Sequence, residues 1–181
     1  MSEARALLTR MGVDKNHVIV GINPGAAYGS AKCWLPERFR AVTEKLLKNK
    51  SITVIYFGDP NTAPLIKQIC ENLPSRVINL AGLTSIRQLA CLIKLCDVLL
   101  TNDSGPMHMA AAIGTPLVAL FGSTNDVTTG PYKGGTVIHK HVDCSPCYKR
   151  ICPLDFRCMK RIEVQEVIEK VLQNLPTHSS L

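Results

Sequence analysis

The fold is decided by Val18-Ile19-Val20-Gly21-Ile22 and by the loop that follows it directly, Asn23-Pro24-Gly25-Ala26-Ala27-Tyr28-Gly29. An uninterrupted apolar run of this length is typical of a strand that is buried on both faces of a parallel sheet. Pro36 and Glu37 then begin a helix that we expect to reach about Lys48, because proline favours the first turn and lysines favour the last. Strand, polar loop and helix in this order predict a βα unit.

The same alternation continues along the chain. We predict further strands over residues 52–57, 76–79, 97–101 and 116–121, and further helices beginning near Thr62, at Ser85 and after Gly105, with a last one over residues 163–174. This order predicts an α/β fold, a doubly wound parallel sheet covered on both faces by helices. We expect the domain over residues 17–175, after a linker or interdomain-helix remnant (1–16) and before a tail (176–181).

Composition limits the class of protein. The 181 residues are 46% hydrophobic and 19% charged, which is too apolar and too weakly charged for a disordered chain. No apolar run approaches the roughly 20 residues of a membrane-spanning helix, and the first residues show no signal-peptide core. We therefore expect a cytoplasmic protein with reduced cysteines.

The positive charge is unevenly placed. The net charge is +7, and lysines and arginines outnumber acidic residues within 133–161. This basic segment indicates either an anionic partner, such as a phosphate, an acidic glycan or a membrane surface, or an ordinary solvated face. Nucleic acid is disfavoured, because aromatic residues make up only 5% and no nucleic-acid-binding module is present.

Polar loops follow the predicted strands at the edge where ligands bind in open parallel sheets. In the first loop, Gly25 and Gly29 allow close backbone approach, and Lys32 suits a phosphate. The alternative is an ordinary strand-to-helix loop with a surface lysine. Neither a Walker A loop nor a GxGxxG fingerprint occurs.

A second loop runs from Asn102 through Asp103 and Ser104 into a helix that contains His108. Helix N-termini attract anions through their free N–H groups and dipole, and a carboxylate beside such a site suits sugar hydroxyls. Asp103 or Ser104 as a simple N-cap remains the alternative. The third loop, residues 122–126, carries the weakest signal.

Four of the eight cysteines gather near the C-terminus with the spacing C-x2-C-x4-C-x5-C; this four-cysteine cluster is Cys144, Cys147, Cys152 and Cys158. Four thiolates at such spacing could hold zinc or an iron–sulfur cluster. The alternative is a tight, proline-containing loop with structural free thiols.

Three stretches together carry a resemblance to a known family: Pro24–Trp34, with Lys32 near its end; Thr101-Asn102-Asp103-Ser104-Gly105-Pro106-Met107-His108; and Gly114-Thr115-Pro116-Leu117-Val118-Ala119-Leu120-Phe121-Gly122. Their order and spacing resemble the ADP-heptose–lipopolysaccharide heptosyltransferases, type II above all. The four-cysteine cluster before a final helix is similar to the C-terminal segment of that family. The resemblance covers residues 17–175.

The resemblance implies one Rossmann-like half of a two-domain GT-B glycosyltransferase, the half that binds the ADP-heptose donor for transfer of heptose to the lipopolysaccharide inner core. It implies that Lys32 stabilises the leaving phosphate and Asp103 binds heptose hydroxyls. The donor-binding residues that it implies are Gly25, Ala26, Lys32, Thr84, Asp103, Ser104, Gly105 and His108. It implies no metal and no cofactor, and an acceptor held by a separate N-terminal half. From the basic segment 133–161 we expect a weak, peripheral contact with the inner membrane.

Two departures from the family pattern matter. Thr62 stands where some relatives carry a glutamate that binds the ribose, so the resemblance leaves open the ribose contact and, with it, the exact donor. The carboxylate that acts as catalytic base lies in the N-terminal half, and no residue of this chain replaces it. A non-catalytic nucleotide- or phosphosugar-binding half-protein is therefore the alternative function. An epimerase-like protein would need the dinucleotide fingerprint that is missing.

Overall fold

In the computed structural model, residues 1–176 are described, and they form a parallel sheet of six strands in the order β3-β2-β1-β4-β5-β6. The strands are β1 (Val18–Asn23), β2 (Ile52–Tyr56), β3 (Val77–Asn79), β4 (Val98–Asn102), β5 (Leu117–Phe121) and β6 (Thr136–His139). Each adjacent pair is parallel. The predicted doubly wound α/β fold is confirmed.

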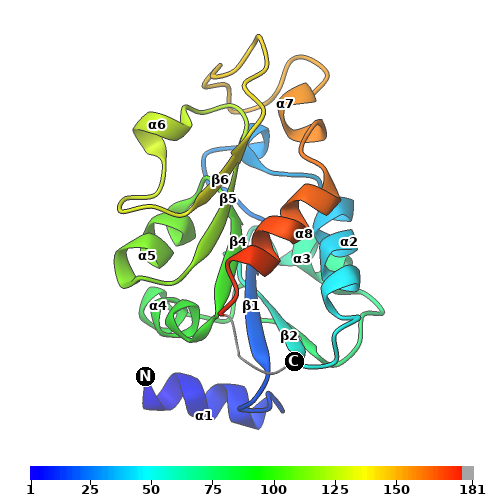
Figure 1. The fold of residues 1–181 in the computed structure, drawn as a ribbon, viewed down its shortest axis with the longest axis vertical. Coiled ribbons are helices and arrows are strands. Elements are labelled where there is room, and N and C mark those ends of the chain that lie inside the picture. The colour runs from blue at the N-terminus through cyan, green and yellow to red at the C-terminus, as the bar shows by residue number, and fades with distance from the viewer. Residues whose placement is uncertain (177–181) are drawn as a thin grey trace.

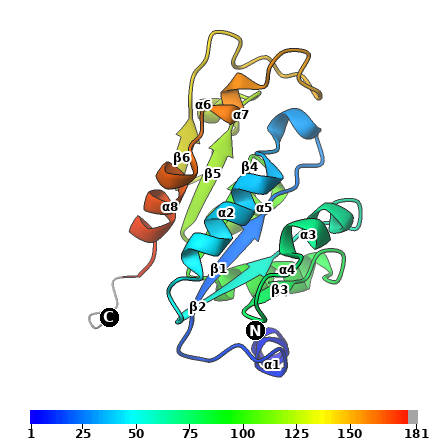
Figure 2. The same ribbon diagram turned by 90° about the vertical axis from the view of Figure 1, so that its right-hand side faces the viewer.

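Helices cover both faces of this sheet (Figures 1 and 2). They are α1 (Ser2–Arg10), the short 3-10 helix η1 (Ser30–Lys32), α2 (Pro36–Leu46), α3 (Ala63–Cys70), α4 (Ile86–Leu95), α5 (Gly105–Ile113), α6 (Asp126–Thr129), α7 (Arg157–Lys160) and α8 (Val164–Gln173). Buried side chains of α2, α3 and α8 share one core cluster, and those of α1, α4 and α5 share the other.

Successive side chains along each strand point into different cores, one on each face of the sheet. In β5, Val118 and Leu120 join the α2/α8 side, whereas Ala119 and Phe121 join the α4/α5 side. All residues of β5 are buried, because successive side chains point to opposite faces of a sheet that helices cover twice. Each large apolar side chain buried in this way contributes about 1.5–3 kcal/mol, which explains why most residues of the central strands are apolar.

Strand order places a topological switch beside β1. The chain moves outward from β1 to β2 and β3, and then returns to β4 on the other side of β1. The register pairs Ile22 with both Tyr56 and Leu100. The loops that follow β1 and β4 therefore lead to opposite faces, and the crevice between them is where ligands bind in such sheets.

The elements outside the predicted core agree with the expectation only in part. The edge strand β6 was not predicted, because its four residues follow Gly134-Gly135 and form too short a run to stand out. Residues 1–16, expected as a linker or helix remnant, contain α1, whose Ala4 and Leu8 are buried in the α4/α5 core. The capping box at Ser85 is present, with reciprocal bonds between Ser85 and Gln88. In the expected tail, residues 177–181 lie outside the described part.

Within residues 1–176, the helices are all too short or too polar to cross a membrane.

Candidate functional site

Two buried asparagines join the loops that follow β1 and β4. Asn23, at the end of β1, donates to the carbonyl of Gly25 at 3.0 Å and to Ser104 Oγ at 3.3 Å. Asn102, at the end of β4, donates to the carbonyl of Pro24 at 2.6 Å and accepts from the Trp34 amide at 3.0 Å. A buried amide must find such partners, so these residues fix the two loops against each other at the switch point.

An ion pair lies directly above this junction. Lys32 Nζ, from η1, is 2.6 Å from Asp103 Oδ2, with side-chain exposures of 13% and 4%. Thr124, from the loop after β5, donates to the same oxygen at 2.6 Å. The structure thus brings together Lys32 and Asp103, which the sequence suggested separately, and adds Thr124 from the third loop.

An aromatic ring and a second cation flank this pair. Lys32 Nζ lies 4.9 Å from the centre of the Tyr28 ring, and Arg150 Cζ lies 5.4 Å from it. Arg150 also donates through Nε to the Tyr28 carbonyl at 2.7 Å, and the Tyr28 hydroxyl donates to the Tyr148 carbonyl at 2.8 Å. From the sequence, Arg150 belongs only to the basic segment 133–161. The structure brings it to the site because the irregular segment after β6 runs back against the loop that follows β1.

Gly29 is needed where these two segments touch. The Ala31 amide donates to the Arg150 carbonyl at 3.0 Å, and a Cβ at Gly29 would lie 2.3 Å from that same oxygen. No side chain fits at such a distance, so a glycine at 29 permits the close approach.

The start of α5 faces the same edge. Ser104 is its N-cap in extended conformation, and Ser104 Oγ lies 3.0 Å from Thr101 Oγ1, so it does not cap the helix. The first N–H groups of a helix have no acceptor in a preceding turn, but here Pro106 has no N–H and the Met107 amide donates to the Ser104 carbonyl at 3.1 Å. The Gly105 N–H is therefore the first-turn donor that remains. A Cβ on Gly105 would meet no other atom within 4 Å, so open space lies over the backbone at this helix start.

The remaining predicted residues are less closely joined. His108 is exposed on α5, and Ala26 is half-buried in the loop after β1. Thr62 is the N-cap of α3, and its side chain approaches Gly25 so closely that a Cβ there would lie 2.8 Å from Thr62 Oγ1. Thr84 precedes α4, beyond β3, and stands two strands away from β1. It is not in contact with the ion pair.

A histidine network borders the site at the end of β6. His139 Nδ1 lies 2.8 Å from Asp126 Oδ1, and His139 Nε2 lies 2.8 Å from Ser145 Oγ. Partial burial acts to raise the pKa of Asp126, but the hydrogen bond from His139 and the nearby His141 outweigh it, and the pKa is lowered. Asp126, His139 and His141 offer metal-ligand atoms within 4.8 Å of one another. Both ring nitrogens of His139 already have partners, so we assign this trio to holding the loop.

The four-cysteine cluster lies beside the site in the irregular segment 140–156 and at the start of α7. Its cysteines are free thiols. Burial raises the pKa of Cys158, and the other three thiols of the cluster raise it further. Cys144, Cys147 and Cys152 therefore each lie within electrostatic reach of Cys158.

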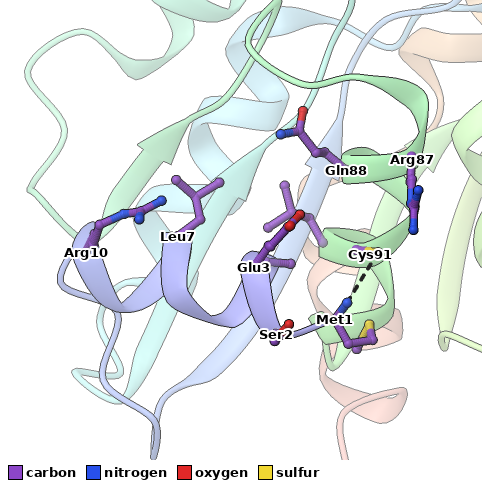
Figure 3. A pocket seen from close by; sticks show the side chains of 10 residues that line it. Met1, Ser2, Glu3, Leu7, Arg10, Arg87, Gln88 and Cys91 are labelled. Atoms are coloured by element: carbon purple, nitrogen blue, oxygen red, sulfur yellow. Dashed lines mark hydrogen bonds between the residues drawn. The ribbon is translucent and has the colours of Figure 1, made fainter.

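Other hollows lie elsewhere on the molecule. One of about 430 Å³ lies between α1 and α4, lined in part by Glu3, Arg10, Arg87 and Cys91 (Figure 3). Figure 1 shows α1 at the end of the sheet opposite the loops that follow β1 and β4. This hollow lacks the convergent loops and helix start of the switch point, and we therefore locate the functional site at the switch point.

Comparison with known proteins assigns a family to this arrangement. The model of the family described as "Glycosyltransferase family 9 (heptosyltransferase)" matches residues 1–156. The chain belongs to glycosyltransferase family 9. Among curated relatives of this family 9 domain, lipooligosaccharide heptosyltransferase 2 of Campylobacter jejuni is 36% identical over 168 residues, which cover 90% of the chain and 52% of the relative. Lipopolysaccharide heptosyltransferase 2 of Salmonella typhimurium is 35% identical, over 71% of the chain and 38% of the relative.

Solved structures agree with this family 9 assignment. Escherichia coli ADP-heptose lps heptosyltransferase II superposes with a TM-score of 0.78 at 26% identity, over 96% of the chain and 51% of that protein. A family 9 glycosyl transferase from Veillonella parvula gives a TM-score of 0.82 at 26% identity, over 96% of the chain and 50% of that protein. The family 9 domain described here therefore spans about half the length of these relatives.

Proposed function

We propose that this domain is the donor-binding half of a heptosyltransferase and that it binds ADP-heptose for transfer of heptose to the lipopolysaccharide inner core. The observation that carries the proposal is the Lys32–Asp103 pair at the β1/β4 switch point, beside the exposed start of α5. The printed names of the relatives, heptosyltransferase 2 and ADP-heptose lps heptosyltransferase II, supply the sugar and the nucleotide.

The charges of the site match a diphosphate. The Lys32 ammonium carries three donors, of which Asp103 takes one. The remaining donors and the Gly105 N–H at the start of α5 would bind the donor phosphates, and Arg150 stands behind Tyr28 as a further cation. As the bond to the anomeric carbon breaks, negative charge grows on the leaving phosphate, and these fixed groups would stabilise it.

Asp103 suits the sugar. Its Oδ2 accepts from both Lys32 and Thr124, so Oδ1 is the oxygen left to accept from heptose hydroxyls. A carboxylate held by two donors keeps its position, and such positioning orients the anomeric carbon for attack. Thr62, beside Gly25, stands where some relatives carry a glutamate that would reach the ribose. Its shorter side chain offers only a hydroxyl, which already donates to Asp59 Oδ1 at 2.7 Å.

The acceptor, the base and the location are further parts of the proposal. An acceptor hydroxyl needs a base within hydrogen-bond reach, and we assign both acceptor and base to an N-terminal half. The reaction would invert the anomeric carbon without a catalytic metal. We place the protein in the cytoplasm, with the basic segment 133–161 in weak contact with the inner membrane.

Calorimetry tests the donor assignment. We expect ADP-heptose to bind, ADP to compete with it, and UDP- and GDP-sugars to bind at least tenfold more weakly. Equal affinity for the three nucleotide sugars would favour the alternative, a general nucleotide-binding module without a transferase role.

Liposome co-sedimentation tests the membrane contact. Binding to anionic vesicles should fall as salt rises, since the attraction is electrostatic. Co-sedimentation that is the same at low and high salt would contradict it.

A further inference from the structure

The four-cysteine cluster surrounds a single cavity. Residues 140–156 form no helix or strand, and Figure 1 shows this yellow-to-orange segment looping beyond β6 before α7 begins. All four cysteines line a cavity of about 180 Å³ beneath it. Within residues 1–176, no three of these sulfurs lie within 4.8 Å of one another, so a bound ion would have to draw them inward from the cavity wall. Long loops without internal structure are uncommon in compact domains and usually have a function.

A buried hydroxyl in the same cavity lacks a partner. Ser123 is 1% exposed and lines the cavity together with the thiols. Among the described residues, its Oγ is the buried side-chain polar atom without a hydrogen-bond partner. Leaving such a group unsatisfied destabilises the fold, so this hydroxyl points to an acceptor inside the cavity. A metal-bound thiolate is such an acceptor, and hydrogen bonds of this kind support metal ligands.

The charges around the cavity favour an anionic centre. Lys149 and Arg157 line it, against one carboxylate, Asp155. Arg157 is bound to Asp155 at 2.9 Å and lies 3.7 Å from Asp143. A divalent ion with four thiolates carries a net charge of −2 by simple addition, and the net positive charge of Lys149, Arg157 and Asp155 in this lining partly offsets it.

We propose that the four-cysteine cluster is a tetrathiolate site for a transition-metal ion, zinc or iron. Four sulfur ligands select these metals, and a C-x2-C pair followed by two further cysteines has the ligand number of closed structural sites. On binding, each thiol releases its proton to solvent, and the sulfurs move inward to about 2.3 Å from a zinc ion. All four positions are then filled by protein, so the ion has a structural role.

The metal site would hold in place the loop that follows β1 and leads to Lys32. Segment 140–156 carries Arg150, whose carbonyl accepts from Ala31 and whose Nε donates to Tyr28. The Tyr148 amide also donates to the Ser123 carbonyl at 2.7 Å. A metal that closes this segment therefore holds the loop before Lys32 in place without touching the donor.

Metal analysis of the full chain tests the site. Protein purified under reducing conditions without added metal should contain about one equivalent of zinc or iron. Visible absorption and a labile-sulfide assay tell zinc, which is colourless, from a single iron or an iron–sulfur cluster. Cobalt added to metal-stripped, reduced protein should give the intense near-ultraviolet bands of thiolate coordination.

Variants locate the ligands. Cys147→Ser should lose at least half of the metal, whereas Cys91→Ser, a half-buried thiol on α4, should keep it. If Cys147→Ser does not fold, hydrogen exchange of the wild-type chain replaces it. Chelation should then speed exchange in residues 144–158 and 26–33 and leave α4 unchanged. Less than about 0.2 equivalents of metal together with no cobalt–thiolate band would overturn the proposal. Equal metal content in the Cys147→Ser and wild-type chains would do the same.

Discussion

Lys32 Nζ and Asp103 Oδ2 are 2.6 Å apart, although 71 residues separate them in the chain. The pair links the loop after β1 to the loop after β4, which are the two sides of the switch point. A charge-assisted bond of this length fixes both groups. The ammonium is thereby held beside the start of α5, and the carboxylate is held with one oxygen still available. The pair can therefore serve two parts of one ligand, a phosphate and a sugar.

Replacing Lys32 with alanine should weaken ADP binding by roughly 1.5–3 kcal/mol, or about 10- to 150-fold, because a charge-assisted contact to phosphate is lost. Calorimetry with ADP measures this directly. Lys50→Ala, at an exposed lysine in the turn before β2, is the matched control and should bind ADP as the wild type does. An unchanged affinity in Lys32→Ala would mean that Lys32 serves only to neutralise Asp103.

Replacing Asp103 with asparagine should lower the affinity for the sugar nucleotide more than the affinity for the nucleotide alone. Asparagine keeps the shape and can still accept from Thr124, but it lacks the charge that accepts strongly from sugar hydroxyls. We expect the affinity for ADP-heptose to fall more than tenfold while that for ADP changes less. Titration of both ligands against one protein preparation gives the two ratios. Equal losses for both would show that Asp103 acts only by positioning Lys32 and the helix start.

Replacing Gly105 with alanine should lower the affinity for ADP and leave the thermal stability of the domain unchanged. The added methyl group meets no protein atom within 4 Å, so the thermal midpoint should stay within the scatter of the wild type. The same methyl group would stand where a phosphate approaches the Gly105 N–H of α5, and ADP affinity should fall about tenfold, equivalent to roughly 1.4 kcal/mol. A stable variant with full ADP affinity would place the phosphates away from this helix.

Sequence reasoning could predict the parts of the site that depend on neighbours in the chain. The all-apolar run of β1 and the loop after it fixed the position of Lys32 relative to the sheet, and the second loop gave Asp103 at the adjacent strand end. Strand order then brings these loops together, since both strands end at one edge. Arg150 was out of reach of such reasoning, because its contact with Tyr28 spans 122 residues and depends on the path of an irregular segment. The hydroxyl of Ser123 was equally hidden, since burial without a partner has no signature in sequence.

The last prediction concerns what this chain can do alone. The domain has its own two-sided core, and the described phosphate-binding groups all lie on one sheet edge. If the groups proposed to bind phosphate do so, ADP should bind to residues 1–181 with a dissociation constant in the tens to hundreds of micromolar, or about 5–6 kcal/mol. Such an affinity suits an open site in which water competes for the phosphates.

Transfer by this chain alone is not expected. Attack on the anomeric carbon needs a base within hydrogen-bond reach of the acceptor hydroxyl, and the one carboxylate described at the switch point, Asp103, is held by Lys32 and Thr124. It also needs the acceptor to be held in line with the leaving phosphate. We expect binding of ADP-heptose but no heptose transfer to a lipopolysaccharide-core acceptor, measured by mass spectrometry against a control without protein. Supplying the N-terminal half of a relative, fused or in trans, should restore turnover. Transfer above the control by residues 1–181 alone would show that the base lies within this chain and that Asp103 is the first residue to test for it.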